Sequence, residues 1–406
     1  MSPSKSKGTQ TNRARLPAEP VPSAGTVTLR AALDAAWQRA VAARETEGQR
    51  RRAEADRAVA SSLWAAPPSL ALSHRDDRLQ SNAGRRETEI GVAVPLWLPG
   101  QRSARAGTSE AAAAQAQAAE QVARLRLAGE VREAAWQVAA LQAELAQADT
   151  QAQSLKQLAD DVERRVRAGD LARADALAAQ AEHLAAAALK ADVQQRLQAA
   201  RSRWTLLTGL TVPPDLTADL ATESPANPPT AAHPEQQFAS QSTELARQRV
   251  ELMRRSRRDA PELTLGVRQD TPGRAEASQG SLVVGLRLPF GTDDRNRPLE
   301  AAALAELDVA QTHEQRLRER LDNEIVTARD ALRSAQAQLD AETARARLLR
   351  ERATLIDKSF RAGETPLPDL LRALAAASQA DSAAARQTTA LGLARARLQQ
   401  ALGLFP

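Results

Sequence analysis

The chain lacks several residue types on which common classes of protein depend. It has no cysteine and no tyrosine, and only 2% of its residues are aromatic. Without cysteine there can be no disulfide, no thiol nucleophile and no cysteine metal cluster. Its four histidines lie far apart and form none of the paired spacings of zinc enzymes: His74, His183, His233 and His313. We interpret them as ordinary surface residues and predict neither a metal site nor a cofactor.

Long apolar runs and one-sided charge are also missing. No run approaches the roughly 20 apolar residues of a membrane-spanning helix. Net charge is +5, and arginine and acid are closely mixed. The most basic segment, Arg254-Arg255-Ser256-Arg257-Arg258, has no aromatic neighbours for base stacking, so a solvated helix end is the favoured interpretation over a nucleic-acid site. The carboxylate pairs Asp76-Asp77 and Asp160-Asp161 are adjacent residues that point apart, and with no nucleophile–base pair we predict no enzyme activity.

What the chain does contain is a duplication. Arg167-Ala168-Gly169-Asp170 recurs 194 positions later as Arg361-Ala362-Gly363-Glu364, and Asp369 follows Asp175 at the same offset. Gly209 and Gly403 keep this offset at the ends of the two copies. A repeat of this length predicts two equivalent structural units.

Each copy contains one very long predicted helix. The helix over 102–166 would extend about 97 Å at the α-helical rise. A coiled-coil register supports it, because small and large apolar residues alternate seven apart along two seam positions. The first seam comprises Leu127, Ala134, Leu141, Ala148, Leu155 and Val162, and the second Val131, Val138, Leu145, Ala152, Ala159 and Val166. The second copy repeats this register over 298–361, and only Glu342 breaks it.

Shorter elements flank the long helices. Thr28–Ala60 is predicted as one helix, and the strands Ser69–Leu79 and Thr88–Leu98 as a hairpin with one apolar face. Gly169 and Gly363 are predicted to end the long helices in the left-handed conformation. In the second copy Thr365 is predicted as an N-cap with Pro366 in the first helical position.

These elements predict the following domain organisation. Residues 1–25 form a disordered leader, 26–210 the first repeat, 211–235 a Pro-rich linker and 236–406 the second repeat. Each repeat runs through a helix, a β-hairpin (69–98, 262–290), a long helix (102–166, 298–361), a tip turn (167–171, 361–367) and a returning helix.

The fold class expected is mainly α with a small β part. Four strands are too few to close a barrel, and an open sheet leaves its edges exposed. Three copies would supply twelve strands and remove the edges. We therefore predict duplicated β-hairpins with long coiled-coil helices that close by symmetric association, in which three copies give twelve strands and the long helices form a helical cylinder.

In this layout the chain resembles the TolC-like outer-membrane factor family over about residues 26–406. The resemblance rests on the duplicated hairpin and long helix, on the tip segments 166–175 and 360–369, and on the repeat ends 206–210 and 401–404. The segment 95–102, Pro-Leu-Trp-Leu-Pro-Gly-Gln-Arg, is most similar to the CzcC-type heavy-metal efflux branch.

The resemblance implies a passive channel subunit of a tripartite efflux system, with metal cations as one cargo class. It implies a homotrimer with a shared twelve-stranded transmembrane β-barrel in the outer membrane of a Gram-negative bacterium and a trimeric α-barrel that extends into the periplasm. The partners it implies are a periplasmic adaptor, an inner-membrane RND or ABC pump and membrane lipid. The adaptor-docking tips would be Arg167, Gly169, Asp170, Leu171, Arg361, Gly363, Glu364, Thr365 and Leu367. The entrance constriction would comprise Asp369, Arg372 and Asp175.

Two departures and several alternatives accompany this resemblance. Arg372 stands where the family has a second entrance aspartate, and Thr365 where it has a latching arginine, so a different closed-state lock is expected. Asp175 and Asp369 also fit a simpler role as acids in the first turn of a helix. The alternative functions are a soluble structural coiled-coil protein and a duct for type I polypeptide secretion. Residues 1–25 lack a secretory signal and a lipidation cysteine, so we expect an export signal encoded upstream of Met1.

Overall fold

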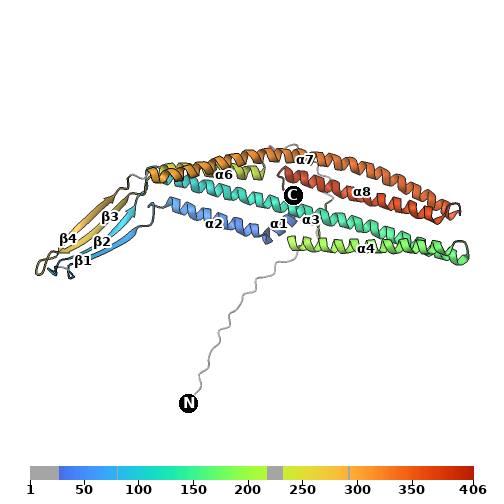
Figure 1. Cartoon of the computed structure of the whole chain (residues 1–406), viewed down its shortest axis with the longest axis horizontal. Helices are drawn as coiled ribbons and strands as arrows, with labels where there is room; N and C mark the ends of the chain where they lie inside the picture. The colour runs from blue at the N-terminus through green and yellow to red at the C-terminus, as the bar shows by residue number, and fades with distance from the viewer. Residues whose placement is uncertain (1–26, 80, 217–231, 291–292) are drawn as a thin grey trace, which may run out of the picture.

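The computed structural model describes residues 27–79, 81–216, 232–290 and 293–406. The predicted leader and residues 217–231 of the predicted linker lie outside them. A long body of helices carries a β-sheet at one end. At the other end lie two turns, each of which connects a pair of antiparallel helices, and the C-terminus lies midway along the body (Figure 1). Within the described ranges, no helix combines the length and the apolar character needed to cross a bilayer.

The first helical segment is divided into two. Helix α1 spans Leu29–Arg39 and α2 spans Val41–Ser61, so the prediction of one continuous helix is wrong. At Ala40 the backbone is extended, and its N–H bonds to the Trp37 carbonyl at 3.2 Å. No proline or glycine causes this break. Tertiary packing accounts for it, because α1 packs against both α3 and α4 whereas α2 follows α3.

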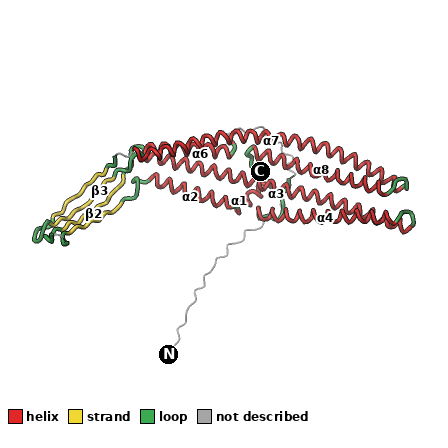
Figure 2. The backbone as a smooth tube through the Cα atoms, in the orientation of Figure 1, coloured by secondary structure: helices red, strands yellow, loops and turns green. Residues whose placement is uncertain are grey.

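The strands, drawn in yellow in Figure 2, form one antiparallel sheet, and their order is β1-β2-β3-β4 (Figure 1). Strand β1 spans Ser69–Asp76, β2 Arg86–Pro95, β3 Glu262–Thr271 and β4 Gln279–Arg287. The hairpins of the two repeats join through β2 and β3, where Gly91 lies opposite Gly266. Strands β1 and β4 are the edges of this four-stranded sheet, and each has one strand neighbour.

The two faces of the sheet differ sharply. One face carries apolar side chains that are 43–75% exposed: Leu70, Leu72, Ile90, Val92, Leu265, Val267, Leu282, Val284 and Leu286. The other face carries small and charged residues, including a cross-strand ion triad. Arg268 contacts Glu87 at 3.0 Å and Glu89 at 2.7 Å. An apolar face this extensive and this exposed is a surface for lipid or protein.

Two long helices run the length of the body. Helix α3 spans Gln101–Ala168 and α7 spans Asp293–Arg361, each about 100 Å long at the α-helical rise. Helix α7 begins before the predicted start at 298 and includes Pro298. All the heptad positions predicted in α7, from Leu321 to Phe360, are buried or partly buried, whereas most positions between them are exposed. The covered side of α7 therefore follows the predicted heptad register.

Shorter helices pack beside and between the two long helices, and together they form a wall of helices. Helix α4 spans Arg173–Thr208, α6 Pro234–Arg255 and α8 Leu367–Ala401. Helix α3 contacts α2 and α6 toward the sheet, and α4 and α8 toward the tips, while α7 contacts α6 and then α8. One edge of this wall is α7, and the other is α2 continued by α4. Both edges expose large apolar side chains: Leu177, Leu184, Val309, Val326, Leu348 and Leu355.

The main core lies in the middle of the body. Leu33, Val131, Trp136 and Trp204 are buried where α1, α3 and α4 meet. Trp136 also lies against α8 at Gly392, where an added Cβ would approach the indole to 2.0 Å. The tips are held by a separate, smaller cluster, so the middle of the body and its tip end depend on different contacts.

Candidate functional site

The two tip turns share one backbone conformation. Gly169 and Gly363 have φ values of +91° and +82°. In the first turn the Asp170 N–H bonds to the Arg165 carbonyl at 2.9 Å, and in the second the Glu364 N–H bonds to the Ser359 carbonyl at 3.0 Å. This is the Schellman pattern that ends helices with a left-handed residue. No neighbour lies within 4 Å of a Cβ added at either glycine, so the backbone alone requires glycine here.

The first turn is closed by a backbone-to-carboxylate contact. The Ala172 N–H donates to the Asp175 carboxylate at 3.2 Å, at the start of α4. Leu171 is partly buried, and Arg167 and Asp170 are exposed. Asp175 thus meets the role of an acid in the first turn of a helix, and its second predicted role, at an entrance, stays a prediction.

The second turn uses hydroxyl groups. The Thr365 hydroxyl donates to Ser359 Oγ at 2.6 Å, and Ser359 Oγ lies 3.3 Å from the Glu364 carboxylate. Helix α8 begins at Leu367 with Pro366 in the cap position, so the prediction that Thr365 caps the helix is wrong. The reason is that the Thr365 hydroxyl turns back to the end of α7, where Ser359 binds it.

Asp369 and Arg372 form an ion pair one turn apart on α8. Their closest atoms are 2.5 Å apart, and both side chains are substantially exposed. Arg372 therefore partly neutralises the carboxylate predicted for the entrance. Asp175 and Asp369 each bond within the start of their own helix, on different hairpins of the chain.

An apolar cluster joins the two tips. Phe360 and Leu370 of the second hairpin are buried against Val162 of the first. The Arg165 guanidinium lies 5.1 Å from the centroid of the Phe360 ring, the geometry of a cation–π contact. Arg165 is a tip residue that sequence reasoning missed. Phe360 was noted as a seam position and as the start of the tip segment 360–369, but its contact with the first hairpin was not predicted.

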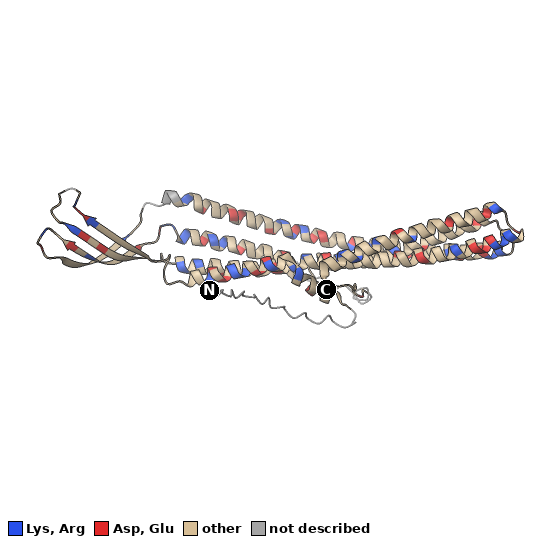
Figure 3. Cartoon of the chain, turned by 90° about the horizontal axis from the view of Figure 1, so that it is seen from below, with Lys and Arg blue, Asp and Glu red and all other residues tan. Residues whose placement is uncertain are grey.

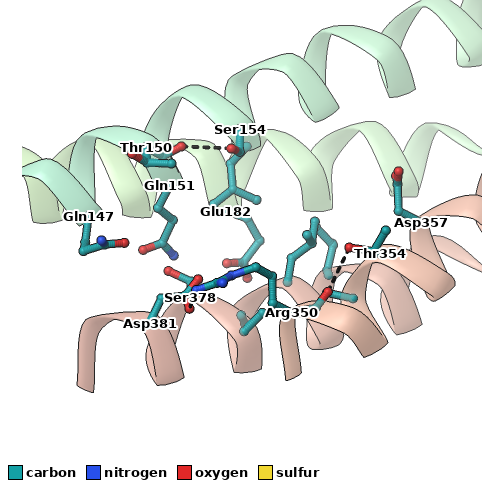
Figure 4. Close-up of a pocket in the computed structure, with 16 residues that line it drawn as sticks. Gln147, Thr150, Gln151, Ser154, Glu182, Arg350, Thr354, Asp357, Ser378 and Asp381 are labelled. Atoms are coloured by element: carbon teal, nitrogen blue, oxygen red, sulfur yellow. Dashed lines mark hydrogen bonds and ion pairs between the residues drawn. The ribbon is translucent and has the colours of Figure 1, made fainter. Parts of the chain in front are cut away.

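Behind the tips, a crevice with both polar and apolar lining separates the hairpins. Its volume is about 320 Å³, and its lining includes Gln147 and Gln151 from α3, Glu182 from α4, Arg350 from α7 and Asp381 from α8. Arg350 and Asp381 point toward each other, 2.5 Å apart, and the two glutamines face them from α3 (Figure 4). The hydrogen bond that Arg350 donates to Asp381, and then the negative charge of that carboxylate, raise the pKa of Arg350.

Charges elsewhere on the body are mixed in sign (Figure 3). The basic segment noted in the sequence ends α6, and two of its arginines pair with acids: Arg254 with Glu300 at 3.4 Å and Arg255 with Glu251 at 2.8 Å. Both arginines are exposed, as predicted for a solvated helix end. In the described part of the chain, no three histidine, aspartate or glutamate side chains are grouped to hold a metal ion.

The prediction that all four histidines are surface residues is wrong for His233. Its side chain lies in the N-cap position of α6, where the ring Nδ1 accepts the Glu235 N–H at 3.2 Å. Burial lowers the pKa of His233 below its ordinary value. The sequence held one signal for this place, since Pro234 follows directly and proline favours the first helical position.

Comparisons with known proteins show the fold. No protein-family model matches the chain, and no curated protein matches it in sequence. The crystal structure of the outer membrane protein VceC from Vibrio cholerae is similar with a TM-score of 0.73 at 16% identity, covering 93% of this chain and 96% of that one. The CmeC outer membrane channel of Campylobacter jejuni is similar with a TM-score of 0.72 at 13% identity, over 95% and 94% of the two chains. The open-state MtrE outer membrane channel of Neisseria gonorrhoeae gives 0.71 at 17% identity, over 93% and 89%.

Proposed function

We propose that this chain is the subunit of a passive outer-membrane channel in a tripartite efflux system, working as a homotrimer in a Gram-negative bacterium. One observation carries the proposal. The sheet presents an exposed apolar face and two edges, and it continues into a helical wall that is also open at both edges. A single copy leaves all of these surfaces uncovered, and the fold is that of solved outer membrane channels.

In the proposed assembly, β4 of one copy pairs with β1 of the next. Twelve strands then close into a barrel without edges, which a bilayer requires. The apolar face would meet lipid, and the face that carries Arg268 and its two glutamates would line the pore. Phe290, which is 89% exposed just beyond β4, and Trp97 beyond β2 lie where barrels carry interfacial aromatic residues.

The same threefold rotation would bring the helical wall of each copy against that of its neighbour. The α7 edge of one copy would pack against the α2 and α4 edge of its neighbour, covering the exposed leucines and valines of both. The result is a helical cylinder that continues the pore away from the membrane. Such a duct performs no chemistry, so the energy for transport would come from an inner-membrane RND or ABC pump.

At the far end, the tips would meet the periplasmic adaptor and narrow the entrance. The exposed residues of both turns, Arg167, Asp170 and Glu364 among them, would form the docking surface with Gly169 and Gly363. Three copies of Asp369 would form an acidic ring that favours cations. Arg372 reduces the negative charge of this ring, because each arginine lies 2.5 Å from an Asp369 oxygen. Metal cations are the proposed cargo class, on the resemblance of segment 95–102 alone.

The assembly is tested by purifying the full chain in detergent, measuring its mass and recording conductance in a planar bilayer. We expect three copies and a steady conductance. A Leu265→Arg, Leu282→Arg double variant should prevent insertion, since arginine on a lipid face costs about 2–4 kcal/mol at mid-bilayer. Ser73→Arg, on the opposite face, is the matched control and should insert. A monomer without conductance would contradict the proposal.

Docking is tested separately by bulky substitutions at the tips. Gly169→Trp and Gly363→Trp should abolish export in cells while trimers remain in the membrane. Gln142→Trp is the control, because Gln142 is exposed on α3, which is flanked by α4 and α8 of its own chain and lies away from the two edges assigned to the trimer contact. Export that survives both tip variants would refute the docking assignment.

A further inference from the structure

The place where the second repeat begins and ends is a packed junction around one imidazole. His233 is only 5% exposed, at the start of α6. Its ring lies against the turn that follows α8, because a Cβ added at Gly403 would approach His233 Cδ2 to 2.6 Å. Gly403 has a φ of +72°, so that turn is fixed by its backbone as well as by the ring.

The neutral ring satisfies both of its nitrogens here. Nδ1 accepts the Glu235 backbone N–H at 3.2 Å, which caps α6. The ring also makes a hydrogen bond to the backbone of Gln400, near the end of α8. One neutral tautomer serves both contacts, with an acceptor at Nδ1 and a donor at Nε2. The imidazole therefore joins the first helix of the second repeat to the last.

The same turn is also tied to the first repeat. Arg132 of α3 is 2% exposed and donates to the Gln400 side-chain oxygen and to the Leu404 carbonyl, both at 2.8 Å. The Gln400 amide donates to the Leu125 carbonyl at 2.8 Å. Three helices from the two repeats, α3, α6 and α8, thus meet at residues 400–404.

The charges around the ring come from several helices. Glu235 on α6 and Glu324 on α7 favour the protonated ring, and Arg320 on α7 opposes it. Arg320 also contacts both acids, at 2.6 Å and 3.3 Å, which weakens their pull on the imidazole. On α3 the charged group of this junction is Arg132, which bonds to Gln400 and Leu404, and α8 contributes the backbone of Gln400. Burial is the largest influence, and it lowers the pKa of His233.

We propose that His233 is an acid-sensitive staple, whose protonation releases the start of α6 from the turn after α8. The proton must go to Nδ1, since Nε2 already carries one. It then faces the Glu235 N–H, so two donors oppose each other and the cap is lost. The inference stands on this junction alone and does not depend on the proposed channel function.

The sign of the pH dependence follows from burial. Because the pKa of His233 is lowered from 6.5, the unfolded chain binds this proton more readily than the folded one. The contribution of the neutral ring is complete above 6.5 and is lost as pH falls through the lower, folded-state value.

Hydrogen exchange of the full chain in detergent tests the staple, at about pH 8 and about pH 5 after correction for intrinsic rates. Amides in segments 234–238 and 400–404 should exchange faster in acid by roughly fivefold, the effect of one lost helix cap. The tip segment 359–372 is the internal reference and should change less.

Two variants keep the test sharp. His233→Asn retains a good capping acceptor that does not protonate, so the acid response of both segments should disappear. His313→Asn changes an exposed histidine on α7 and should respond as the natural chain does. An acid response that is absent from the natural chain, or that persists in His233→Asn, overturns the proposal.

Discussion

The turn after α3 and the turn after α7 follow the same backbone path, but different side chains hold them. In each, a glycine in the left-handed region ends the helix, and the N–H of the residue after the glycine bonds to the carbonyl five positions before that residue. In the first turn a carboxylate accepts a backbone N–H, from Ala172 to Asp175. In the second turn hydroxyl groups bridge Thr365 and Ser359, and the acid Asp369 pairs with Arg372.

The difference shows which part of a repeated turn is determined by geometry. The left-handed glycine and the Schellman hydrogen bond are common to both turns, where a long helix reverses within a few residues. The side chains around each turn are not fixed by this backbone conformation. The two hairpins therefore contribute side chains of different size to the packing of the tips. The second hairpin brings the large residues Phe360, Leu367 and Leu370 to the tip cluster, and the first brings the smaller Ala159, Val162 and Ala179.

Among these variants, Phe360→Ala should lower the stability of the tip cluster the most. Phe360 is 3% exposed and joins the hairpins, and removing a buried phenylalanine costs about 3–5 kcal/mol. Arg165 would also lose the ring beneath it. We expect a lower denaturation midpoint in detergent, followed by circular dichroism, and faster hydrogen exchange at both tips.

The matched control is Val166→Ala, at the equivalent position of the first repeat. Val166 is only partly buried, so the change should cost about 1 kcal/mol. Equal losses from the two variants would show that the hairpins contribute equally to the tip, against the asymmetry inferred here.

Replacing either tip glycine by alanine should have an intermediate and equal effect. Both added methyl groups meet open space, so only the left-handed backbone opposes them, at about 1–2 kcal/mol each. Gly169→Ala and Gly363→Ala should therefore accelerate amide exchange at their own turns to the same extent. A clear difference between them would mean that the surrounding side chains, and not the backbone, determine the need for glycine.

Much of this architecture follows from periodicity in the sequence. The long helix predicted over 102–166 runs from Gln101 to Ala168, and the seam positions of α7 are its covered ones. The turn glycines are readable because a helix that must reverse leaves few alternatives to a residue without a Cβ. Repetition strengthens each of these signals, since a pattern found twice at one offset is rarely accidental.

The features that sequence reasoning missed depend on contacts between distant residues. Ala40 breaks a helix with no local signal, because α1 and α2 have different neighbours. His233 is buried by a turn 170 positions later, at Gly403. Arg165 stacks on Phe360 across the two hairpins. Thr365 has the right type for a cap, but Ser359 competes for its hydroxyl. Intrinsic helix and capping preferences are properties of local sequence, so they do not include contacts with distant residues.

The two first-turn acids should differ modestly in what they contribute to stability. Asp175→Ala removes the acceptor for the Ala172 N–H and should cost about 0.5–1 kcal/mol, seen as faster exchange in the first turn of α4. Asp369→Ala removes an exposed ion pair, for which about 0.5 kcal/mol or less is expected at the start of α8. Asn variants at both positions separate the loss of charge from the loss of the acceptor. A larger cost at Asp369 would reverse the assignment of roles.

Arg372→Ala should give the smallest change in stability and still be informative about the entrance. It leaves the Asp369 carboxylate in place without the guanidinium that lies 2.5 Å from it. In the proposed trimer the acidic ring would then be uncompensated, and cation preference should rise. Reversal potentials across a salt gradient measure that preference, and Asp369→Asn should shift them the opposite way. Arg173→Ala, on an exposed residue at the start of α4, is the control for losing one tip arginine and should leave the potential unchanged. If Arg372→Ala also leaves it unchanged while Asp369→Asn lowers it, the carboxylate acts at the entrance without regard to its partner. If neither variant moves it, Asp369 is only an acid in the first turn of a helix, as Asp175 is.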